Sequence, residues 1–335
     1  MKIAEGKFVV TGGASLIGSH VAEQLLSQGA REVVLLDNFA LGSPDTVKSL
    51  LGDPRMKLLR GDILRINELY DAFEGCDGVF AIAGFLTLPL SQNPSLGLAV
   101  NVEGQVNIFE ACRYRNVKKV VFSSSVAVYG DPAPGLVDEQ APARLGTFQP
   151  AAALYSCTKL IGENLCKLYS AKHGIQAVAL RYSTVYGERQ HYRGVNALYI
   201  MENYDRIARG EAPVITGDGS EVHDYIHVAD VARANVMAMA SDVTAESFNV
   251  VTGVATSLNR LVEILLSITG SKLKPVFKSG GGSVRSSVTD QLDFSRAKAE
   301  KMLGWMPEVS IEEGIRRLLE WRKAQDSTEK SKAAS

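Results

Sequence analysis

The stretch Lys7-Phe8-Val9-Val10-Thr11-Gly12-Gly13-Ala14-Ser15-Leu16-Ile17-Gly18 decides the fold of this chain. Lys7–Thr11 has the composition of a buried strand, and an apolar helical pattern runs over 17–27. Glycines between a strand and a helix permit a tight turn, and the helix N-terminus offers N–H groups to a pyrophosphate. The stretch therefore indicates a parallel α/β sheet with a candidate dinucleotide site at its first turn.

Short β-branched runs alternate with longer helical patterns through the first 180 or so residues, which is typical of βα units. We expect a Rossmann-type, doubly wound parallel sheet of the α/β class. The predicted strands are 7–11, 32–37, 56–60, 78–83, 118–123 and 177–181, and the predicted helices between them are 17–27, 66–73, 94–115 and 154–173.

The alternation breaks after Tyr182, where a loop-rich segment holds one predicted helix, 198–208. A predicted helix over 227–240 and a predicted strand over 248–251 follow, and they could return the chain to the first sheet. We therefore expect a smaller, discontinuous C-terminal substrate lobe. Residues 1–184 and about 224–252 would form the dinucleotide-binding domain, 185–223 and about 253–325 the lobe, with helices over 258–268, 295–303 and 311–324, and 326–335 a disordered tail.

Composition narrows the class of protein. The 335 residues carry 36 Lys and Arg against 37 Asp and Glu, without a basic cluster, so we expect neither a nucleic-acid nor a membrane partner. No apolar run reaches about 18 residues, and a strand starting at Lys7 leaves no room for a secretory leader. The four cysteines lack Cys-x-x-Cys spacing, which favours reduced thiols in the cytoplasm and no metal site.

Tyr155 and Lys159 are the strongest chemical signal. Residues four apart share one face of a helix, so a phenol and an ammonium would point at one ligand, and the cation would stabilise the phenolate. Ser125, at the end of the preceding predicted strand, could hold a substrate oxygen while the tyrosine moves the proton. Tyr114 and Lys118 repeat the spacing, but only Tyr155 follows the serines and opens an apolar helical pattern.

Two acidic residues end neighbouring strands. Asp37 closes the second predicted strand, where a carboxylate can accept hydrogen bonds from a ribose diol, and no arginine follows it to receive a 2′-phosphate. This favours NAD over NADP. Asp62 follows the third strand and could either meet the adenine or simply occupy a turn.

Together these residues resemble an extended short-chain dehydrogenase/reductase of the NAD-dependent epimerase/dehydratase family. Within that family the pattern is most similar to that of UDP-glucose 4-epimerases. The resemblance covers nearly the whole chain. Its landmarks are the glycine turn, FSSSVAVYG over 122–130, Tyr155 and Lys159, LRY over 180–182, GDG over 217–219, DYIHVADVA over 224–232 and LGWMP over 303–307.

The resemblance implies roles for individual residues. It makes Ser125, Tyr155 and Lys159 catalytic, with Tyr155 as the acid/base, and it implies homodimerisation through helices near 94–115 and 154–173. The implied NAD-binding residues are Gly12, Ser15, Leu16, Ile17, Gly18, Asp37, Asn38, Asp62, Ile63, Ala83, Asn101, Ser123, Tyr155, Lys159 and Tyr182. The implied substrate-binding residues are Phe85, Thr87, Ser125, Thr184, Asn196, His223 and Arg285.

Four departures from the family pattern bear on the ligands. Ser15 replaces the middle glycine of the phosphate turn, so its hydroxyl either weakens pyrophosphate binding or donates to it. Thr184 and His223 stand where the family has an asparagine and an arginine for the substrate diphosphate, and the loop from Phe85 is unusually apolar. Arg285 competes with Lys278 and Arg296 for a second phosphate contact. These departures predict weaker binding of a substrate diphosphate than the family pattern provides.

Three functions remain open from the residues. The first is nucleotide-sugar 4-epimerisation through a transient keto intermediate; the second is NAD-dependent oxidation or reduction of a smaller or more apolar alcohol. The third is an NAD-sensing protein without catalysis, against which the joint presence of Ser125, Tyr155 and Lys159 argues. A dehydratase needs an acidic pair after the serine strand, whereas this chain has Val126 and Ala127 there.

Overall fold

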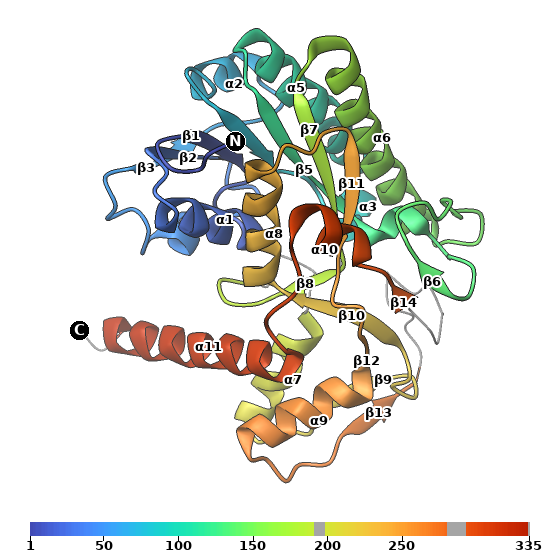
Figure 1. The fold of residues 1–335 in the computed structure, drawn as a ribbon. Coiled ribbons are helices and arrows are strands. Elements are labelled where there is room, and N and C mark those ends of the chain that lie inside the picture. The colour runs from blue at the N-terminus through green and yellow to red at the C-terminus, as the bar shows by residue number, and fades with distance from the viewer. Residues whose placement is uncertain (191–197, 280–292, 334–335) are drawn as a thin grey trace.

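The computed structural model describes residues 1–190, 198–279 and 293–333. Its centre is a seven-stranded sheet in which all neighbours are parallel, in the order β11-β7-β5-β4-β1-β2-β3 (Figure 1). The strands are β1 (Lys7–Thr11), β2 (Glu32–Asp37), β3 (Met56–Arg60), β4 (Gly78–Ala81), β5 (Lys119–Ser125), β7 (Gln176–Tyr182) and β11 (Glu246–Val250). The expected α/β class and doubly wound sheet are confirmed.

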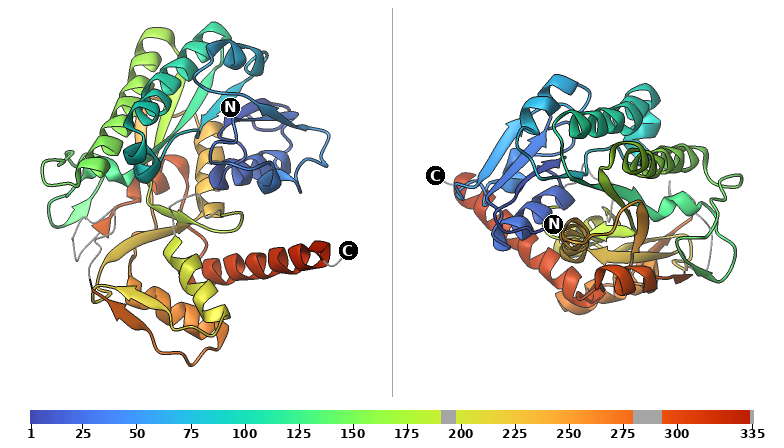
Figure 2. Two further views of the ribbon diagram at one scale, coloured as in Figure 1. Left: turned by 180° about the vertical axis from the view of Figure 1, so that it is seen from behind. Right: turned by 45° about the horizontal axis from the view of Figure 1, so that its top comes forward.

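Helices cover both faces of this sheet (Figure 2). On one face α1 (Leu16–Ser27) packs against α8 (Val228–Ala240); on the other, α5 (Gly104–Tyr114) lies between α2 (Ile66–Ala72) and α6 (Pro150–His173). Shorter helices lie in the connections: η1 (Pro44–Val47), α3 (Thr87–Gln92), α4 (Pro94–Leu98), η2 (Ala99–Glu103) and η3 (Val126–Tyr129).

Two hydrophobic cores follow from the alternation of side chains along each strand. In β1, Phe8 and Val10 belong to the core under α1 and α8, whereas Val9 belongs to the core under α2, α5 and α6. All three side chains are fully buried. The inner strands therefore read as continuous apolar runs, which is why the sequence located β1 and β2 at their observed bounds. The bounds predicted for β3 also match, although this edge strand is only partly buried.

The strand order creates the crevice that matters for binding. After β1, β2 and β3 the chain crosses back to β4 on the other side of β1, so the connections leave β1 and β4 in opposite directions. Ligands of open α/β sheets bind at such a switch point, outside the carboxyl ends of the strands. Gly12 and Ala83 flank it.

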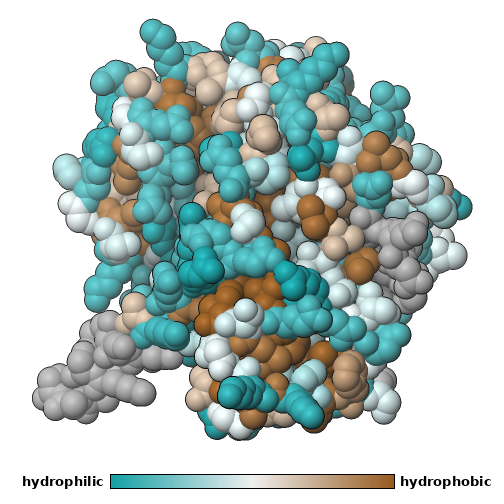
Figure 3. Space-filling view, turned by 60° about the horizontal axis from the view of Figure 1, so that its bottom comes forward, coloured by the Kyte–Doolittle hydropathy of each residue, from teal (hydrophilic) through white to brown (hydrophobic). Residues whose placement is uncertain are grey.

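A second group of elements lies below the large sheet in Figure 1. It contains a three-stranded sheet, β12-β10-β8, and a pair β13-β9, with α7, α9 and α11 around them. The bounds are β8 (Thr184–Tyr186), α7 (Leu198–Ala208), β9 (Val214–Thr216), β10 (Val222–His227), β12 (Ala255–Ser257), α9 (Leu258–Thr269), β13 (Val276–Lys278) and α11 (Ile311–Ala333). Seen from below, this lobe carries hydrophobic side chains among hydrophilic ones (Figure 3).

The helix expected over 94–115 is interrupted. Its middle is the π-helical turn η2, which separates α4 from α5. A π turn inserts an extra residue into the helical ladder and often marks a functional site. Here the turn contains Asn101, whose amide bonds both backbone groups of Phe85.

Two C-terminal expectations need correction. Residues 293–305 were expected in the second lobe, but β14 (Asp293–Phe294) pairs with β6 (Leu136–Val137), and α10 (Ala297–Leu303) packs on β11 and α8. Apolar burial draws this segment to the large sheet, since Trp305 is fully buried in the core under α8. The tail expected from residue 326 has helical backbone to Ala333, in a stretch without glycine or proline.

Candidate active site

A first cavity of about 210 Å³ lies at the switch point of the large sheet. Nine of the residues expected to bind the cofactor line it: Gly12, Ser15, Leu16, Ile17, Asp37, Asn38, Asp62, Ile63 and Ala83. Gln190 lines it as well, although nothing in the sequence around it marked it as a site residue.

The glycines of the first turn are required by close backbone contacts. Gly12 has φ +68°, and a Cβ there would lie 2.9 Å from the backbone nitrogen of Ala83. A Cβ on Gly18 would lie 2.3 Å from the carbonyl oxygen of Gly12. Gly18 therefore acts by letting α1 approach the turn, and it does not belong to the cavity lining.

Ser15 is the N-cap of α1. Its φ of −98° is open to any residue, and its Oγ accepts a hydrogen bond from the backbone nitrogen of Gly18 at 3.2 Å. Because the oxygen accepts in this contact, the hydroxyl hydrogen is left to donate into the cavity. The replacement of glycine therefore stabilises the helix start and adds a donor where a pyrophosphate would lie.

Asp37 joins the end of β2 to the glycine turn. Its Oδ2 accepts from the backbone nitrogen of Ala14 at 3.0 Å, and its Oδ1 accepts from that of Phe39 at 2.8 Å. Burial raises the pKa of Asp37, and these two backbone hydrogen bonds oppose the rise. Each carboxylate oxygen has a further lone pair, so the fixed carboxylate can also accept from a ribose diol.

A second cavity of about 180 Å³ shares Ile17, Ile82, Gly84, Phe85 and Leu86 with the first, so the two form one crevice. Its lining brings together residues from β5, α6, the end of β7, β8 and β10. The expected site residues found there are Phe85, Thr87, Ser123, Ser125, Tyr155, Lys159, Tyr182, Thr184 and His223.

Ser125 ends β5 and caps the short helix η3. Its Oγ accepts from the backbone nitrogen of Ala127 at 3.2 Å. This contact fixes the oxygen while leaving the hydroxyl hydrogen to donate to a ligand oxygen. The strand end thus supplies an oriented donor inside the second cavity.

Tyr155 and Lys159 lie on the buried face of α6. The Lys159 Nζ donates to the backbone oxygen of Ser123 at 2.9 Å and lies 5.5 Å from the centre of the Tyr155 ring. Burial lowers the pKa of Lys159 to about 8. Near neutral pH the ammonium is therefore mostly charged, and it lies where it can stabilise a phenolate.

A buried ion pair joins α6 to β7, and a hydrogen bond from the end of β5 reaches the same carboxylate. Arg181 donates to both carboxylate oxygens of Glu163, at 2.7 and 2.8 Å, and Ser124 donates to Glu163 at 2.6 Å. Burial lowers the pKa of Arg181, but its bonds to Glu163 outweigh burial and raise the pKa overall. Glu163 was not among the residues predicted from the sequence, although its place four residues after Lys159 puts it on the catalytic face of the helix.

Asn101 lies beside the crevice without lining either cavity. Its Oδ1 accepts from the backbone nitrogen of Phe85 at 2.6 Å, and its Nδ2 donates to Phe85 O at 2.9 Å and to Thr158 Oγ1 at 3.3 Å. Asn101 therefore holds the loop that lines the crevice, and a contact between Asn101 and the cofactor stays a prediction. Asn196 and Arg285 lie outside the described residues.

His223 is paired with a carboxylate. Its Nε2 lies 2.7 Å from Oε1 of Glu221, a partner the sequence analysis did not single out. Arg296, a competing phosphate contact, is also engaged: it binds the backbone oxygen of Thr252 and the Glu300 carboxylate. Lys278 is exposed on β13. A negative charge beside His223 opposes the binding of a substrate phosphate there.

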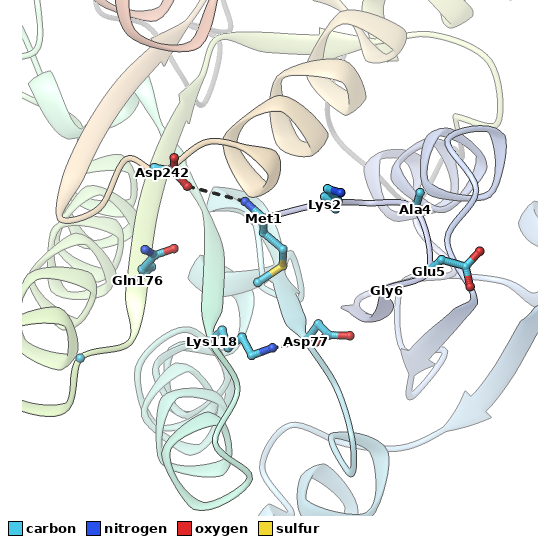
Figure 4. Close-up of a pocket in the computed structure, with 10 residues that line it drawn as sticks. Met1, Lys2, Ala4, Glu5, Gly6, Asp77, Lys118, Gln176 and Asp242 are labelled. Atoms are coloured by element: carbon cyan, nitrogen blue, oxygen red, sulfur yellow. Dashed lines mark hydrogen bonds and ion pairs between the residues drawn. The ribbon is translucent and has the colours of Figure 1, made fainter.

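A wider hollow of about 610 Å³ lies at the opposite, amino end of the strands (Figure 4). Four of its charged groups form two pairs: the Met1 ammonium with Asp242 at 3.8 Å, and Lys118 with Asp77 at 3.3 Å. None of the expected site residues lines it. The chemistry of the molecule therefore belongs to the crevice at the carboxyl ends.

Two further observations concern the described part of the chain, one on metal ligands and one on membrane-spanning helices. It contains no group of three His, Cys, Asp or Glu residues that could hold a metal ion. Within the same residues, no helix combines the length and apolarity needed to span a membrane. The crevice presents a phosphate-turn helix, a ribose-accepting carboxylate and a Ser-Tyr-Lys set, which fits a nicotinamide dinucleotide.

Comparison with known proteins supports this reading. A putative UDP-glucose 4-epimerase of Methanocaldococcus jannaschii is 35% identical over 325 residues, covering 96% of this chain and 99% of the relative. A solved UDP-glucose 4-epimerase of Thermotoga maritima with UDP-glucose has a TM-score of 0.82 and 30% identity, covering 95% and 99% of the two chains. One of Thermus thermophilus in complex with NAD has a TM-score of 0.80 and 29% identity, covering 94% and 99%.

The match to a family model covers most of the large sheet and the crevice. Residues 8–251, from β1 to the residue after β11, match the model of the NAD dependent epimerase/dehydratase family. That range contains the glycine turn, Asp37 and the Ser125, Tyr155 and Lys159 set. The resemblance seen in the sequence is thus confirmed, and the chain belongs to the NAD dependent epimerase/dehydratase family, with NAD as its cofactor.

Proposed function

We propose that this protein is a nucleotide-sugar 4-epimerase that carries out its chemistry in the crevice formed by the two cavities. The observation that carries the proposal is the joint presence of Ser125, Tyr155 and Lys159 in the second cavity, which continues into the glycine-turn cavity. The names of the relatives and of the solved structures support a UDP-sugar as the substrate class.

The dinucleotide would lie along the whole crevice. Asp37 would accept from the adenosine ribose, while Ser15 and the first turn of α1 would donate to the pyrophosphate. Ser123 and Lys159 would hold the nicotinamide end. Bound NAD supplies a hydride acceptor that can return the hydride.

Three side chains would bind the oxygen at C4 of the substrate sugar or transfer its proton. Ser125 donates to the oxygen at C4 of the sugar and orients it. Tyr155 takes the proton of the C4 hydroxyl as the C4–H hydride leaves, and it returns this proton when the hydride comes back to the other face of the keto sugar. The Lys159 ammonium stabilises the phenolate that exists between proton transfers.

The residues after β5 favour epimerisation over elimination of water. Val126 and Ala127 follow Ser125, so this strand end supplies no acid and base for dehydration. The His223–Glu221 pair and the apolar Phe85 side of the crevice instead favour the second candidate, oxidation of a smaller alcohol. The two candidates differ in whether reduced nicotinamide accumulates.

We further propose that the protein is a homodimer through α4, α5 and α6. Leu96, Leu98, Ile161 and Leu168 are each between 38% and 44% exposed, and a shallow hollow on α6 is lined largely by leucine and isoleucine. Apolar side chains exposed on one helical layer are the kind of surface that a second copy buries. All four cysteines are unpaired, which supports a cytoplasmic location.

The proposed activity is tested by incubating the purified protein with UDP-glucose or UDP-galactose, with and without added NAD, and separating the sugar nucleotides. Interconversion of the two without net nicotinamide reduction is expected. A panel of free alcohols is the comparison: stoichiometric NADH from an alcohol, with no sugar-nucleotide conversion, would establish the dehydrogenase instead.

A further inference from the structure

Ser123 belongs to a chain of hydrogen bonds that leaves the second cavity and ends inside the protein. Its Oγ lies 3.2 Å from the Tyr182 hydroxyl, which lies 3.0 Å from Oδ1 of Asn235, and Asn235 Nδ2 lies 2.8 Å from the backbone oxygen of Val231. Asn235 is fully buried, and Tyr182 and Ser123 are only 5% and 6% exposed. Water therefore has little access to the hydroxyl groups in the middle.

The direction of every hydrogen in this chain follows from its inner end. The carbonyl of Val231 can only accept, so the Asn235 amide must turn its NH₂ toward it, and this leaves Oδ1 facing Tyr182. Oδ1 can only accept, so the Tyr182 hydroxyl donates to it. A hydroxyl carries one hydrogen, so Ser123 must be the donor in its contact with Tyr182.

The state of Tyr182 keeps this direction fixed near neutral pH. Burial raises the pKa of Tyr182 to about 12, so the phenol retains its hydrogen. The only hydrogen of the Ser123 hydroxyl is thus committed to Tyr182. Toward the second cavity, which it lines, Ser123 Oγ can offer only lone pairs.

We propose that Asn235 and Tyr182 are positioning residues that make Ser123 a hydrogen-bond acceptor for the carboxamide NH₂ of the nicotinamide ring. This step rests on the proposed placement of the nicotinamide end in the second cavity. Lys159 strengthens the choice, because its ammonium has no lone pair with which to accept from that NH₂, and it already donates to the backbone oxygen of Ser123. The crevice thus selects a dinucleotide whose ring substituent carries an N–H donor.

Binding of ring analogues tests the selection without turnover. The apoprotein is titrated with NAD, with the thionicotinamide analogue, which keeps the NH₂, and with the 3-acetylpyridine analogue, which replaces it by a methyl group. We expect the thio analogue to bind within about threefold of NAD and the acetylpyridine analogue at least about tenfold more weakly, since its ring substituent has no donor for Ser123.

Two variants test the role of the Ser123 hydroxyl: one removes its hydrogen-bond partner, and the other removes the hydroxyl itself. Tyr182→Phe removes the acceptor of the Ser123 hydrogen, so this hydroxyl can rotate and donate to the acetyl carbonyl, and the discrimination should fall below about threefold. Ser123→Ala removes the acceptor itself and should weaken NAD while leaving the acetylpyridine analogue nearly unchanged. Tyr169→Phe is the matched control: its hydroxyl bonds Glu110 between α6 and α5, so the discrimination should stay as in the wild type.

The outcomes separate the inference from the proposed function. Equal wild-type affinities for NAD and the acetylpyridine analogue, or an unchanged preference in Ser123→Ala, would overturn the inference while NAD binding itself stands. Failure of NAD to bind the wild-type protein would instead contradict the cofactor site. A preference that Tyr182→Phe leaves unchanged would overturn the positioning role. If this variant does not fold, Asn235→Ala replaces it: the Tyr182 hydrogen is then free to point at Ser123, and the discrimination should fall in the same way.

Discussion

The Lys159 ammonium lies 5.5 Å from the centre of the Tyr155 ring, four residues away on the buried face of α6. The pair Tyr114 and Lys118 has the same spacing but different surroundings, since Tyr114 is 61% exposed and Lys118 bonds Asp77 at the other end of the sheet. Spacing alone thus does not distinguish the two pairs. Position at the carboxyl end of β5 does, because only there do both side chains of the pair line the crevice.

Replacing Tyr155 by phenylalanine should lower turnover at least about a hundredfold, because the general acid/base is lost while ring packing is kept. NAD affinity, measured by calorimetry, should change little. Tyr114→Phe is the matched control and should turn over as the wild type does. Near-wild-type turnover of Tyr155→Phe would remove this tyrosine from the mechanism.

Lys159→Met should stabilise the protein near neutral pH, because it removes a buried ammonium. Folded Lys159 releases its proton near pH 8 and the unfolded residue near 10.5, so between these values the unfolded wild-type chain binds more protons. Wild-type stability should therefore rise relative to Lys159→Met by about 1.4 kcal/mol per pH unit within this window, and not below it. Denaturant unfolding of both proteins at about pH 7 and about pH 9.5 measures the difference; a constant difference would contradict the lowered pKa.

An arginine at position 223 should improve phosphate binding only when its carboxylate neighbour is neutral. In the double variant Glu221→Gln with His223→Arg the guanidinium can bind a diphosphate, and UDP affinity should rise about tenfold, or about 1.4 kcal/mol. His223→Arg alone should gain less, because Glu221 would compete for the fork.

Calorimetry with UDP on the wild type, both single variants and the double variant separates these cases. Tight wild-type binding that none of the changes alters would show that position 223 does not face the substrate phosphate.

A charge on the exposed face of α6 should separate the proposed dimer. The variant Ile161→Asp with Leu168→Asp places two carboxylates in that surface, so light scattering should report a dimer for the wild type and a monomer for the variant. Met302→Asp on α10 is the matched control, since Met302 is 42% exposed, and it should remain dimeric. A monomeric wild type at micromolar concentration would contradict the proposed dimer.

The sequence predicted best where chemistry is local. Apolar runs located β1 and β2, and the glycines that follow a strand located the turn at Gly12, because both signals are contiguous in the sequence. The Ser125, Tyr155 and Lys159 set could be predicted as one cluster because the parallel sheet brings the end of β5 to the start of α6.

Contacts that depend on side-chain rotamers or join distant segments were not predictable in the same way. Glu221 directly precedes β10 and lies two residues from His223, yet only side-chain rotamers decide that the two meet. Asn235 reaches Tyr182 from α8 across 53 positions, and Asn101 turns to Phe85 because a π turn interrupts its helix. No periodic pattern in the sequence predicts these contacts.

The fate of the hydrogen at C4 distinguishes epimerisation from simple oxidation of the substrate. The purified protein is incubated with UDP-glucose carrying deuterium at C4, and the isolated sugar nucleotides are analysed by mass spectrometry and NMR, with nicotinamide absorbance recorded in parallel. Epimerisation through a keto intermediate predicts UDP-galactose that retains the deuterium at C4, without net formation of reduced nicotinamide. Loss of the deuterium into a pool of reduced nicotinamide, with a ketone as the product, would contradict epimerisation and identify the protein as a dehydrogenase.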